Sequence, residues 1–232
     1  MGDIYTRTRL ILGDENIKRL QQATVAVFGI GGVGSFAAEA LARAGVGHLV
    51  LIDSDKVDIT NCNRQIHALT STIGVAKADA MEERLKLVNP TIEITKIKEF
   101  YLPENRAVFF PLQYDFIVDA IDTITSKIDL ARYADEVGLR LISSMGTGNK
   151  LHPERLELAD IYETSVCPIA RIMRKKLKLA GVKKLKVVYS KEEPLKVPEL
   201  DGERVPGSTS FVPSTAGLIA AGYVVRELCG IA

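Results

Sequence analysis

The chain alternates short apolar runs with segments whose apolar residues recur every three or four positions. Residues 24–28 and 48–52 are apolar runs of strand length, and residues 33–44 between them carry apolar side chains at helical spacing. This order predicts a strand, a glycine-containing turn, a helix and a second strand, which is a βαβ unit. The same alternation predicts strands at 92–97, 116–120 and 139–143 and helices at 77–88, 104–110 and 126–137.

The pattern changes beyond about residue 145. A strand at 156–159, a basic helix after Pro168, a strand at 185–189 and a last helix at 214–228 are predicted around a Pro-, Gly- and charge-rich segment at 191–209. We therefore predict an α/β fold, a Rossmann-like doubly wound and mainly parallel sheet with an appended C-terminal α+β lobe. Residues 1–232 are expected to form a single domain, with a nucleotide-binding core at 1–150 and a substrate lobe at 151–232.

Composition limits the partners, metals and cellular compartment that we expect for the protein. Its 232 residues carry a net charge of +1, so an anionic partner has to be attracted by a local patch. The cysteines, Cys62, Cys167 and Cys229, are isolated from one another, which disfavours a zinc site and fits a reducing compartment. We expect a cytoplasmic protein, because neither a signal peptide nor an apolar run long enough for a bilayer is present.

A glycine turn follows the first predicted strand. Gly29 permits the turn, Gly31 and Gly32 leave room for a phosphate at the backbone, and Gly34 allows close helix packing. The helix that follows presents free N–H groups and the positive end of its dipole. Asp53 ends the next strand about 20 residues later, where an acid binds ribose in dinucleotide-binding folds. Glycines can serve packing alone, but this context favours nucleotide binding.

Further polar residues distinguish this site from a simple dinucleotide holder. Arg64, in the segment 60–65, and Lys77, at the start of the next helix, are cations of the kind that stabilise charge building on pyrophosphate. Asp122 follows the strand at 116–120 and is suited to hold Mg²⁺ against phosphate oxygens, whereas Asp119 is expected to be structural. The alternatives are a solvated basic loop and an Asp122 that only caps a helix.

The helix after Pro168 is strongly basic. Its cations are spaced to share one face, and no acid interrupts residues 164–191. Such a patch in a nearly neutral protein favours contact with an RNA backbone, although a solvated helix face has the same appearance. The residues predicted to bind RNA are Arg171, Arg174, Lys175, Lys176 and Lys178.

These motifs together resemble a known family, the ubiquitin-activating-like adenylating enzymes, which include the activators of sulfur carriers. The resemblance is carried by residues 29–35, 51–55, 60–68, 74–77 and 119–122. Within that superfamily, residues 63–69, 144–149, 167–174 and 213–217 are similar to those of tRNA threonylcarbamoyladenosine dehydratases. The resemblance implies a homodimer that uses ATP and Mg²⁺ to cyclise threonylcarbamoyladenosine, the modified base 3′ of the anticodon, with loss of water.

The resemblance also implies residue roles. Asp53 would hold the ribose, Arg64 and Lys77 the phosphates, and Asp122 the magnesium ion. Asn61 and Gln65 would complete the pocket, and Arg9 would reach the triphosphate of the neighbouring subunit. Arg7 stands two residues away, and the sequence does not choose between the two arginines.

Two alternative functions remain open at this point. One is activation of the C-terminus of a sulfur-carrier or ubiquitin-like protein, which the lack of paired cysteines and the basic helix disfavour. The other is a nucleotide-binding scaffold without turnover, which the set of Arg64, Lys77 and Asp122 disfavours. The expected partners include a sulfur-relay protein, and for Cys167 we favour a packing or pocket role over nucleophilic catalysis.

Overall fold

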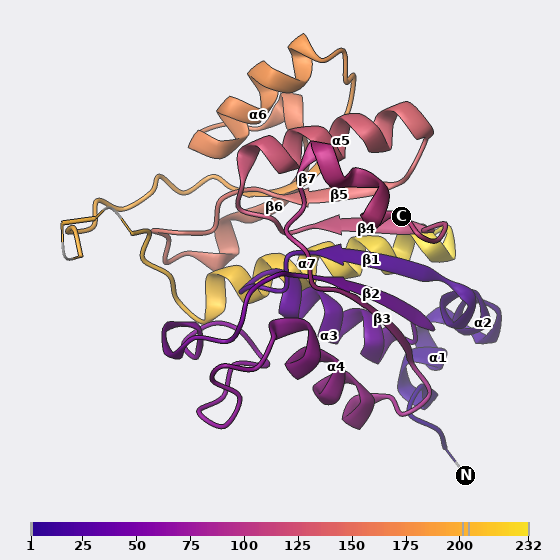
Figure 1. Cartoon of the computed structure of the whole chain (residues 1–232). Coiled ribbons are helices and arrows are strands. Elements are labelled where there is room, and N and C mark those ends of the chain that lie inside the picture. The colour runs from indigo at the N-terminus through magenta and orange to yellow at the C-terminus, as the bar shows by residue number, and fades with distance from the viewer. Residues whose placement is uncertain (1, 201, 204, 232) are drawn as a thin grey trace.

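A seven-stranded sheet forms the centre of the computed structural model, which describes residues 2–200, 202–203 and 205–231 (Figure 1). Its strand order is β3-β2-β1-β4-β5-β7-β6. All neighbours are parallel except β6 and β7, so the predicted mainly parallel α/β sheet is confirmed. The strands are β1 (Thr24–Phe28), β2 (His48–Ile52), β3 (Glu93–Ile97), β4 (Phe116–Asp119), β5 (Leu141–Ser144), β6 (Leu156–Asp160) and β7 (Lys186–Ser190).

Helices cover both faces of the sheet, because alternate strand residues point to opposite sides. Val25 and Val27 join the core beneath α3, α4 and α7, whereas Ala26 and Phe28 join the core beneath α5 and α6. The helices are α1 (Thr6–Leu12), α2 (Asp14–Gln22), α3 (Gly34–Ala44), α4 (Lys77–Val88), α5 (Ile124–Val137), α6 (Pro168–Leu179) and α7 (Phe211–Cys229). Short 3-10 turns are Ile59–Asn61, Pro103–Phe109, Pro153–Arg155 and Ile161–Glu163.

The C-terminal part of the chain extends the central sheet instead of forming a sheet of its own. Strand β7 pairs in parallel with β5, and β6 closes the edge in antiparallel fashion. Helix α7 lies along α3 so closely that a Cβ on Gly217 would stand 2.3 Å from the carbonyl oxygen of Val33. The residues predicted as an appended lobe therefore share the core of the nucleotide-binding half.

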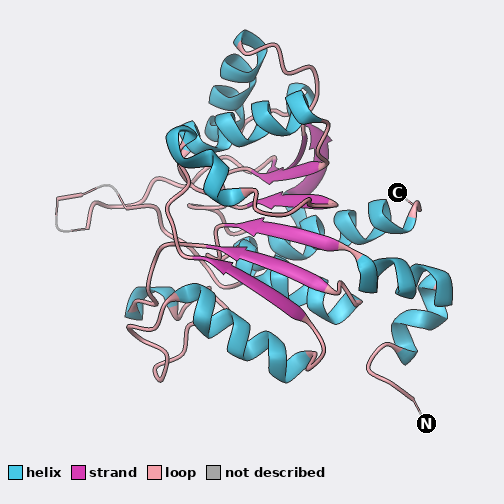
Figure 2. Cartoon of the chain, turned by 45° about the vertical axis from the view of Figure 1, so that its right-hand side comes forward, coloured by secondary structure: helices cyan, strands magenta, loops and turns pink. Residues whose placement is uncertain are grey.

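The N-terminal residues form two helices that meet at Gly13 (φ +81°). The Asn89 side chain donates a hydrogen bond of 2.7 Å from Nδ2 to the Tyr5 hydroxyl, which joins the start of α1 to the end of α4. Figure 2 shows α1 and α2 at the end of the sheet where the parallel strands begin. They lie opposite the carboxyl ends of the strands.

Two further differences concern helices. The last helix begins at Phe211, three residues before the predicted start, and places Pro213 in its first turn, where no intrahelical N–H bond is lost. The helix predicted at 104–110 is a 3-10 segment. Within the described part of the chain, no helix combines the length and apolar character that a membrane span requires.

Candidate functional site

A cavity of about 530 Å³ opens at the carboxyl ends of β1, β2, β4 and β5. The strand order reverses between β1 and β4, and ligands bind at such a point in open α/β sheets. The walls bring together segments from residue 28 to residue 213. Of the predicted site residues, those lining the cavity are Gly29, Gly31, Gly32, Asp53, Asn61, Arg64, Gln65, Lys77 and Asp122.

The glycine turn has the geometry that its predicted roles require. Gly29 has a φ of +84°, and a Cβ there would meet the Ala120 carbonyl oxygen at 2.7 Å. A Cβ on Gly34 would lie 1.8 Å from the Gly29 carbonyl oxygen, so Gly34 serves packing behind the cavity. The Cβ position of Gly31 faces open space. The start of α3 has no side-chain cap, and its Ser35 N–H donates to the Gly31 carbonyl oxygen at 3.0 Å, so the N–H groups that precede Ser35 are those available to an anion.

Asp53 links the end of β2 to the glycine turn. Its Oδ2 accepts a hydrogen bond of 2.6 Å from the backbone N–H of Ile30, and its Oδ1 accepts one of 2.9 Å from Asp55. Burial raises the pKa of the Asp53 carboxyl, while Lys77 and the two backbone donors act in the opposite direction. The carboxylate is thus fixed in place at the cavity wall.

Lys77 is a buried cation held by acids. It is the first residue of α4, and its backbone N–H donates to the Asp55 carbonyl oxygen at 2.9 Å. Its Nζ lies 2.7 Å from Asp55 Oδ2 and 3.9 Å from Asp53 Oδ1. The Lys77 ammonium, which was predicted to bind phosphate, therefore reaches the cavity with its charge partly compensated and its position defined.

Arg64 and Gln65 present unused hydrogen-bonding capacity to the same cavity. The Arg64 guanidinium donates to the Thr60 carbonyl oxygen and to Asn63 Oδ1, both at 2.9 Å. No carboxylate of the described residues lies within 4.0 Å of it. The buried Oε1 of Gln65 has no donor among the described residues. Asn61 has a local role, because its Oδ1 accepts the Asp58 N–H at 3.2 Å.

Asp122 stands at the rim of the cavity on the loop between β4 and α5. Its carboxylate accepts one hydrogen bond, from Thr123 Oγ1 at 3.3 Å, and it is exposed. It does not cap α5, because Thr123 is the N-cap and makes no side-chain cap bond. No cluster of three or more His, Cys, Asp or Glu among the described residues could hold a metal. A single carboxylate suits Mg²⁺, which is commonly bound by one or two carboxylates plus substrate phosphates.

Lys127 is a cavity residue that the sequence interpretation missed. The side chain is only 2 % exposed, and its Nζ lies 2.9 Å from Oδ2 of Asp119. Lys127 is three, four and seven positions before Leu130, Ala131 and Ala134, which are all buried on α5. A lysine on the buried face of a predicted helix is the signal that could have identified it.

A short segment over the cavity was also missed. Residues 205–208, which we call the strap, contribute to the cavity lining. Asn149, at φ +58°, accepts a hydrogen bond of 2.6 Å on Oδ1 from the Gly207 N–H, and its own N–H donates to the Gly207 carbonyl oxygen. Asn63 Nδ2 donates to the Ser208 carbonyl oxygen at 3.0 Å. The strap therefore connects two walls of the cavity.

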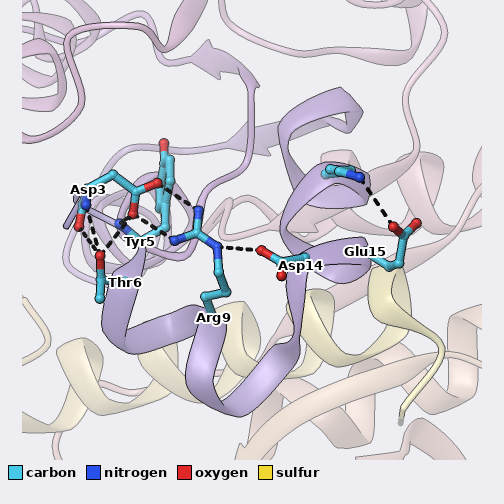
Figure 3. Close-up of polar contacts among 7 residues, drawn as sticks. Asp3, Tyr5, Thr6, Arg9, Asp14 and Glu15 are labelled. Atoms are coloured by element: carbon cyan, nitrogen blue, oxygen red, sulfur yellow. Dashed lines mark hydrogen bonds and ion pairs between the residues drawn. The ribbon is translucent and has the colours of Figure 1, made fainter. Parts of the chain in front are cut away.

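Arg9 lies outside the cavity of its own chain. Figure 3 shows its guanidinium on α1 between two acids, with Nη2 2.7 Å from Asp3 and Nε 2.7 Å from Asp14. Arg7 on the same helix is exposed. Since α1 lies at the opposite end of the sheet, neither arginine contributes to the nucleotide cavity within one chain, and a role across a dimer stays a prediction.

Helix α6 begins at the cavity, which Ile169 lines, and carries the basic residues along its length. Arg174 is half-buried and donates to the Thr164 carbonyl oxygen at 2.7 Å. Ile172 lies between these cations and is 39 % exposed. The exposed basic residues are Arg171, Lys175, Lys176 and Lys178, and none is within 4.0 Å of a carboxylate in the described part of the chain.

Comparisons with known proteins agree with this arrangement. The ThiF family matches residues 5–230. The tRNA threonylcarbamoyladenosine dehydratase of Bacillus subtilis (strain 168) is 45 % identical, over 97 % of this chain and 94 % of the relative. The crystal structure of the E. coli tRNA N6-threonylcarbamoyladenosine dehydratase in complex with ATP superposes with a TM-score of 0.89. It is 33 % identical, over 97 % of this chain and 93 % of that one.

A relative of another function matches a smaller part. An adenylyltransferase and sulfurtransferase of Culex quinquefasciatus is 35 % identical over 53 % of this chain and 28 % of the relative.

Proposed function

The chain belongs to the ThiF family, and on that premise we propose that it is an enzyme which uses ATP to dehydrate threonylcarbamoyladenosine in tRNA. The relative from Bacillus subtilis, which it matches almost end to end, supports this assignment. The observation that carries it is the cavity itself, where a glycine turn, a ribose-type acid, two cations and a rim carboxylate converge. A protein that only binds a dinucleotide has no need of the two cations and the rim carboxylate.

We propose that the nucleotide lies across β2 and β1. The ribose hydroxyls donate to Asp53, and the phosphates lie over Gly31 against the start of α3. Arg64, which has no carboxylate within 4.0 Å among the described residues, and Lys77 stabilise the negative charge that moves onto pyrophosphate. The Oε1 atom of Gln65 accepts a hydrogen bond from the nucleotide. Asn61 stabilises the conformation of the loop by accepting the Asp58 N–H.

The chemistry requires no protein nucleophile. A carboxylate oxygen of the threonyl group bonds to the α-phosphorus of ATP, while the bond to pyrophosphate breaks and its electron pair leaves with pyrophosphate. A nitrogen of the same substituent then bonds to the acyl carbon, AMP leaves with the electrons of the broken C–O bond, and the nitrogen loses its proton. Both reacting groups are on one base, which gives the second step its proximity advantage. The base has lost one water.

We propose Asp122 as the residue that holds Mg²⁺. The exposed carboxylate at the cavity rim has no cation within 4.0 Å among the described residues, so it is free to accept one. The ion would neutralise phosphate charge during departure of pyrophosphate. Asp122 thus complements Arg64 and Lys77 from the other side of the glycine turn.

We further propose a cytoplasmic homodimer in which Arg9 acts on the triphosphate in the partner's cavity. The proposal is supported by the position of Arg9, which cannot serve its own cavity from α1. Its ion pairs with Asp3 and Asp14 are exposed and therefore weak, so they can be exchanged for a phosphate contact.

Helix α6 is the proposed contact for the tRNA backbone, because it joins exposed cations to the cavity wall. Residues 1–232 then act as one adenylating domain, in which residues 151–232 provide the side that faces the tRNA.

One experiment separates this function from its alternatives. Purified protein is incubated with ATP, Mg²⁺ and tRNA that carries threonylcarbamoyladenosine. The tRNA is then digested, and the masses of its nucleosides are measured by mass spectrometry. The proposal expects the modified nucleoside to lose the mass of one water, with release of pyrophosphate that depends on the modified tRNA. Adenylation of a sulfur-carrier protein without this mass change would support the carrier-activating alternative, and nucleotide binding without pyrophosphate release would support a scaffold.

A further inference from the structure

Lys127 is a buried cation whose hydrogen-bonding capacity is not used within the described protein. Its Nζ stands 2.9 Å from Asp119 Oδ2, an ion-pair distance, yet it makes no hydrogen bond with a described residue. Asp119 is satisfied by other donors, because Ser143 Oγ donates to its Oδ2 at 2.5 Å and the Ile121 N–H donates to its Oδ1 at 3.1 Å. An ammonium group has three donors, so Lys127 retains protons for a ligand in the cavity that it lines.

The order of strands places Lys127 next to the proposed nucleotide position, at the other end of the cavity from the ribose and the phosphates. Along the sheet edge run β2 with Asp53, β1 with the glycine turn, β4 with Asp119, and β5 with residues 144–148. The proposed ribose and phosphate positions occupy the β2 and β1 end. Lys127 belongs to the β4 and β5 end, on the side where Gly146 meets Ile169 of α6. A substrate arriving along α6 meets Lys127 before it reaches the α-phosphate.

The group that arrives from this side is an anion. In the proposed reaction it is the threonyl carboxylate, which has to lose its water shell in order to enter the cavity. Burying a carboxylate without a partner is unfavourable, and it would enter a region that already contains the acids Asp119 and Asp122. A buried ammonium with unused donors offsets that cost and fixes the direction of the carboxylate.

We propose that the Lys127 ammonium binds the threonyl carboxylate of the tRNA substrate and directs it at the α-phosphate of ATP. This inference rests on the proposed function and deepens it by assigning a substrate-binding residue. Lys127 would make the enzyme select tRNA that carries the carboxylate over tRNA with an unmodified adenosine. Contacts of α6 with the backbone cannot make that distinction.

Variants at Lys127 and Asp119 distinguish an effect on substrate binding from an effect on folding. Lys127→Met alone leaves Asp119 buried without a cation, which destabilises the fold on any account. The double variant Asp119→Asn/Lys127→Met removes both charges, and Lys127→Arg keeps both. We expect the double variant to keep the ATP affinity of the wild type but to lose about tenfold or more in kcat/KM for modified tRNA.

The second readout is direct binding of tRNA in the absence of turnover. The wild type should bind modified tRNA more tightly than unmodified tRNA, and the double variant should bind the two equally. Lys127→Arg, which folds without an unpaired charge, should retain ATP affinity and lose kcat/KM because its guanidinium cannot occupy the same position. Lys150→Met removes a buried lysine that does not line the cavity and serves as the control.

The outcomes distinguish the possible failures. If the double variant and Lys127→Arg both keep the kcat/KM and the tRNA preference of the wild type, Lys127 only neutralises Asp119 and the inference is wrong. Loss of ATP affinity would equally overturn it, because Lys127 would then bind the nucleotide. A wild type that does not dehydrate modified tRNA refutes the proposed function itself, whatever the variants do.

Discussion

The carboxylate of Asp53 accepts the backbone N–H of Ile30 at 2.6 Å, so the end of β2 is tied directly to the glycine turn after β1. The same carboxylate is proposed to hold the ribose. A residue that supports the phosphate turn therefore also positions the sugar, and the distance between the two subsites is set by one side chain.

Replacing Asp53 should consequently weaken ATP binding strongly. We expect Asp53→Ala to raise the dissociation constant of ATP by about tenfold or more, because charge-assisted hydrogen bonds contribute about 1.5–3 kcal/mol. Isothermal titration calorimetry measures the change. Asp135→Ala, which removes an exposed acid from α5, is the matched control. An Asp53→Ala protein that is folded and binds ATP normally would contradict the proposed ribose contact.

The proposed action of Arg9 across the dimer can be tested by mixing inactive variants. Arg9→Ala and Lys77→Ala should each be inactive as homodimers. In a mixed dimer, one cavity receives Lys77 from its own chain and Arg9 from the partner, so about a quarter of all sites should regain turnover in a statistical mixture. Pyrophosphate release measures the recovery.

The same mixture distinguishes the two arginines of α1. Arg7→Ala mixed with Lys77→Ala should give no recovery beyond the activity that Arg7→Ala has alone. Recovery in that mixture, and none with Arg9→Ala, would assign the role to Arg7. If Arg9→Ala is fully active as a homodimer, Arg9 has no part in the reaction.

The exposed cations of α6 should govern tRNA affinity without affecting nucleotide binding. Replacing Lys175, Lys176 and Lys178 with Glu should weaken tRNA binding. The slope of log K for tRNA association against log salt concentration should become shallower by about 2–3, as expected for the loss of three phosphate contacts. Binding titrations over a range of salt concentrations measure both effects.

A control with the same net charge reverses Lys18, Lys86 and Lys98, which lie outside α6 and pair with acids. Equal loss of tRNA affinity in both triple variants would mean that α6 has no special role. Loss of ATP affinity in the α6 variant would contradict the separation of the two surfaces.

His67 predicts a dependence of stability on pH. Burial, assisted by Lys77 and Arg84, lowers its pKa to about 4, and neither ring nitrogen has a partner among the described residues. The unfolded chain therefore binds a proton between pH 6.5 and 4 that the folded chain does not, so stability falls as pH falls through this window. The loss between pH 7 and 5 should be about 2 kcal/mol.

Urea unfolding at pH 7 and pH 5 measures this difference. His67→Leu should reduce it by most of that amount, whereas His152→Ala, at an exposed histidine, should leave it unchanged. An unaltered pH dependence in His67→Leu would show that other groups cause the loss.

Local sequence patterns sufficed to predict the strands and helices that surround the cavity and most of the predicted site residues that line it. The glycine turn, Asp53 and Asp122 follow from the rule that parallel strands end at one edge. The partner of Asn149 did not follow, because the contact between Asn149 and Gly207 spans 58 residues. Likewise, pairing of β7 with β5 joins segments that are separated by β6 in the chain, and periodicity carries no information about such pairing.

The packing of α7 on α3 has a consequence for biosynthesis. The start of α3 forms the phosphate-binding end of the cavity, yet its neighbours include Gly217 and Pro213 of the last helix. A chain emerging from the ribosome thus has its glycine turn early but acquires the surface behind it only when α7 has left the exit tunnel. We expect nascent chains to be unable to retain ATP until residues 211–229 have left the ribosome, so nucleotide binding by a nascent chain reports that α7 has packed on α3.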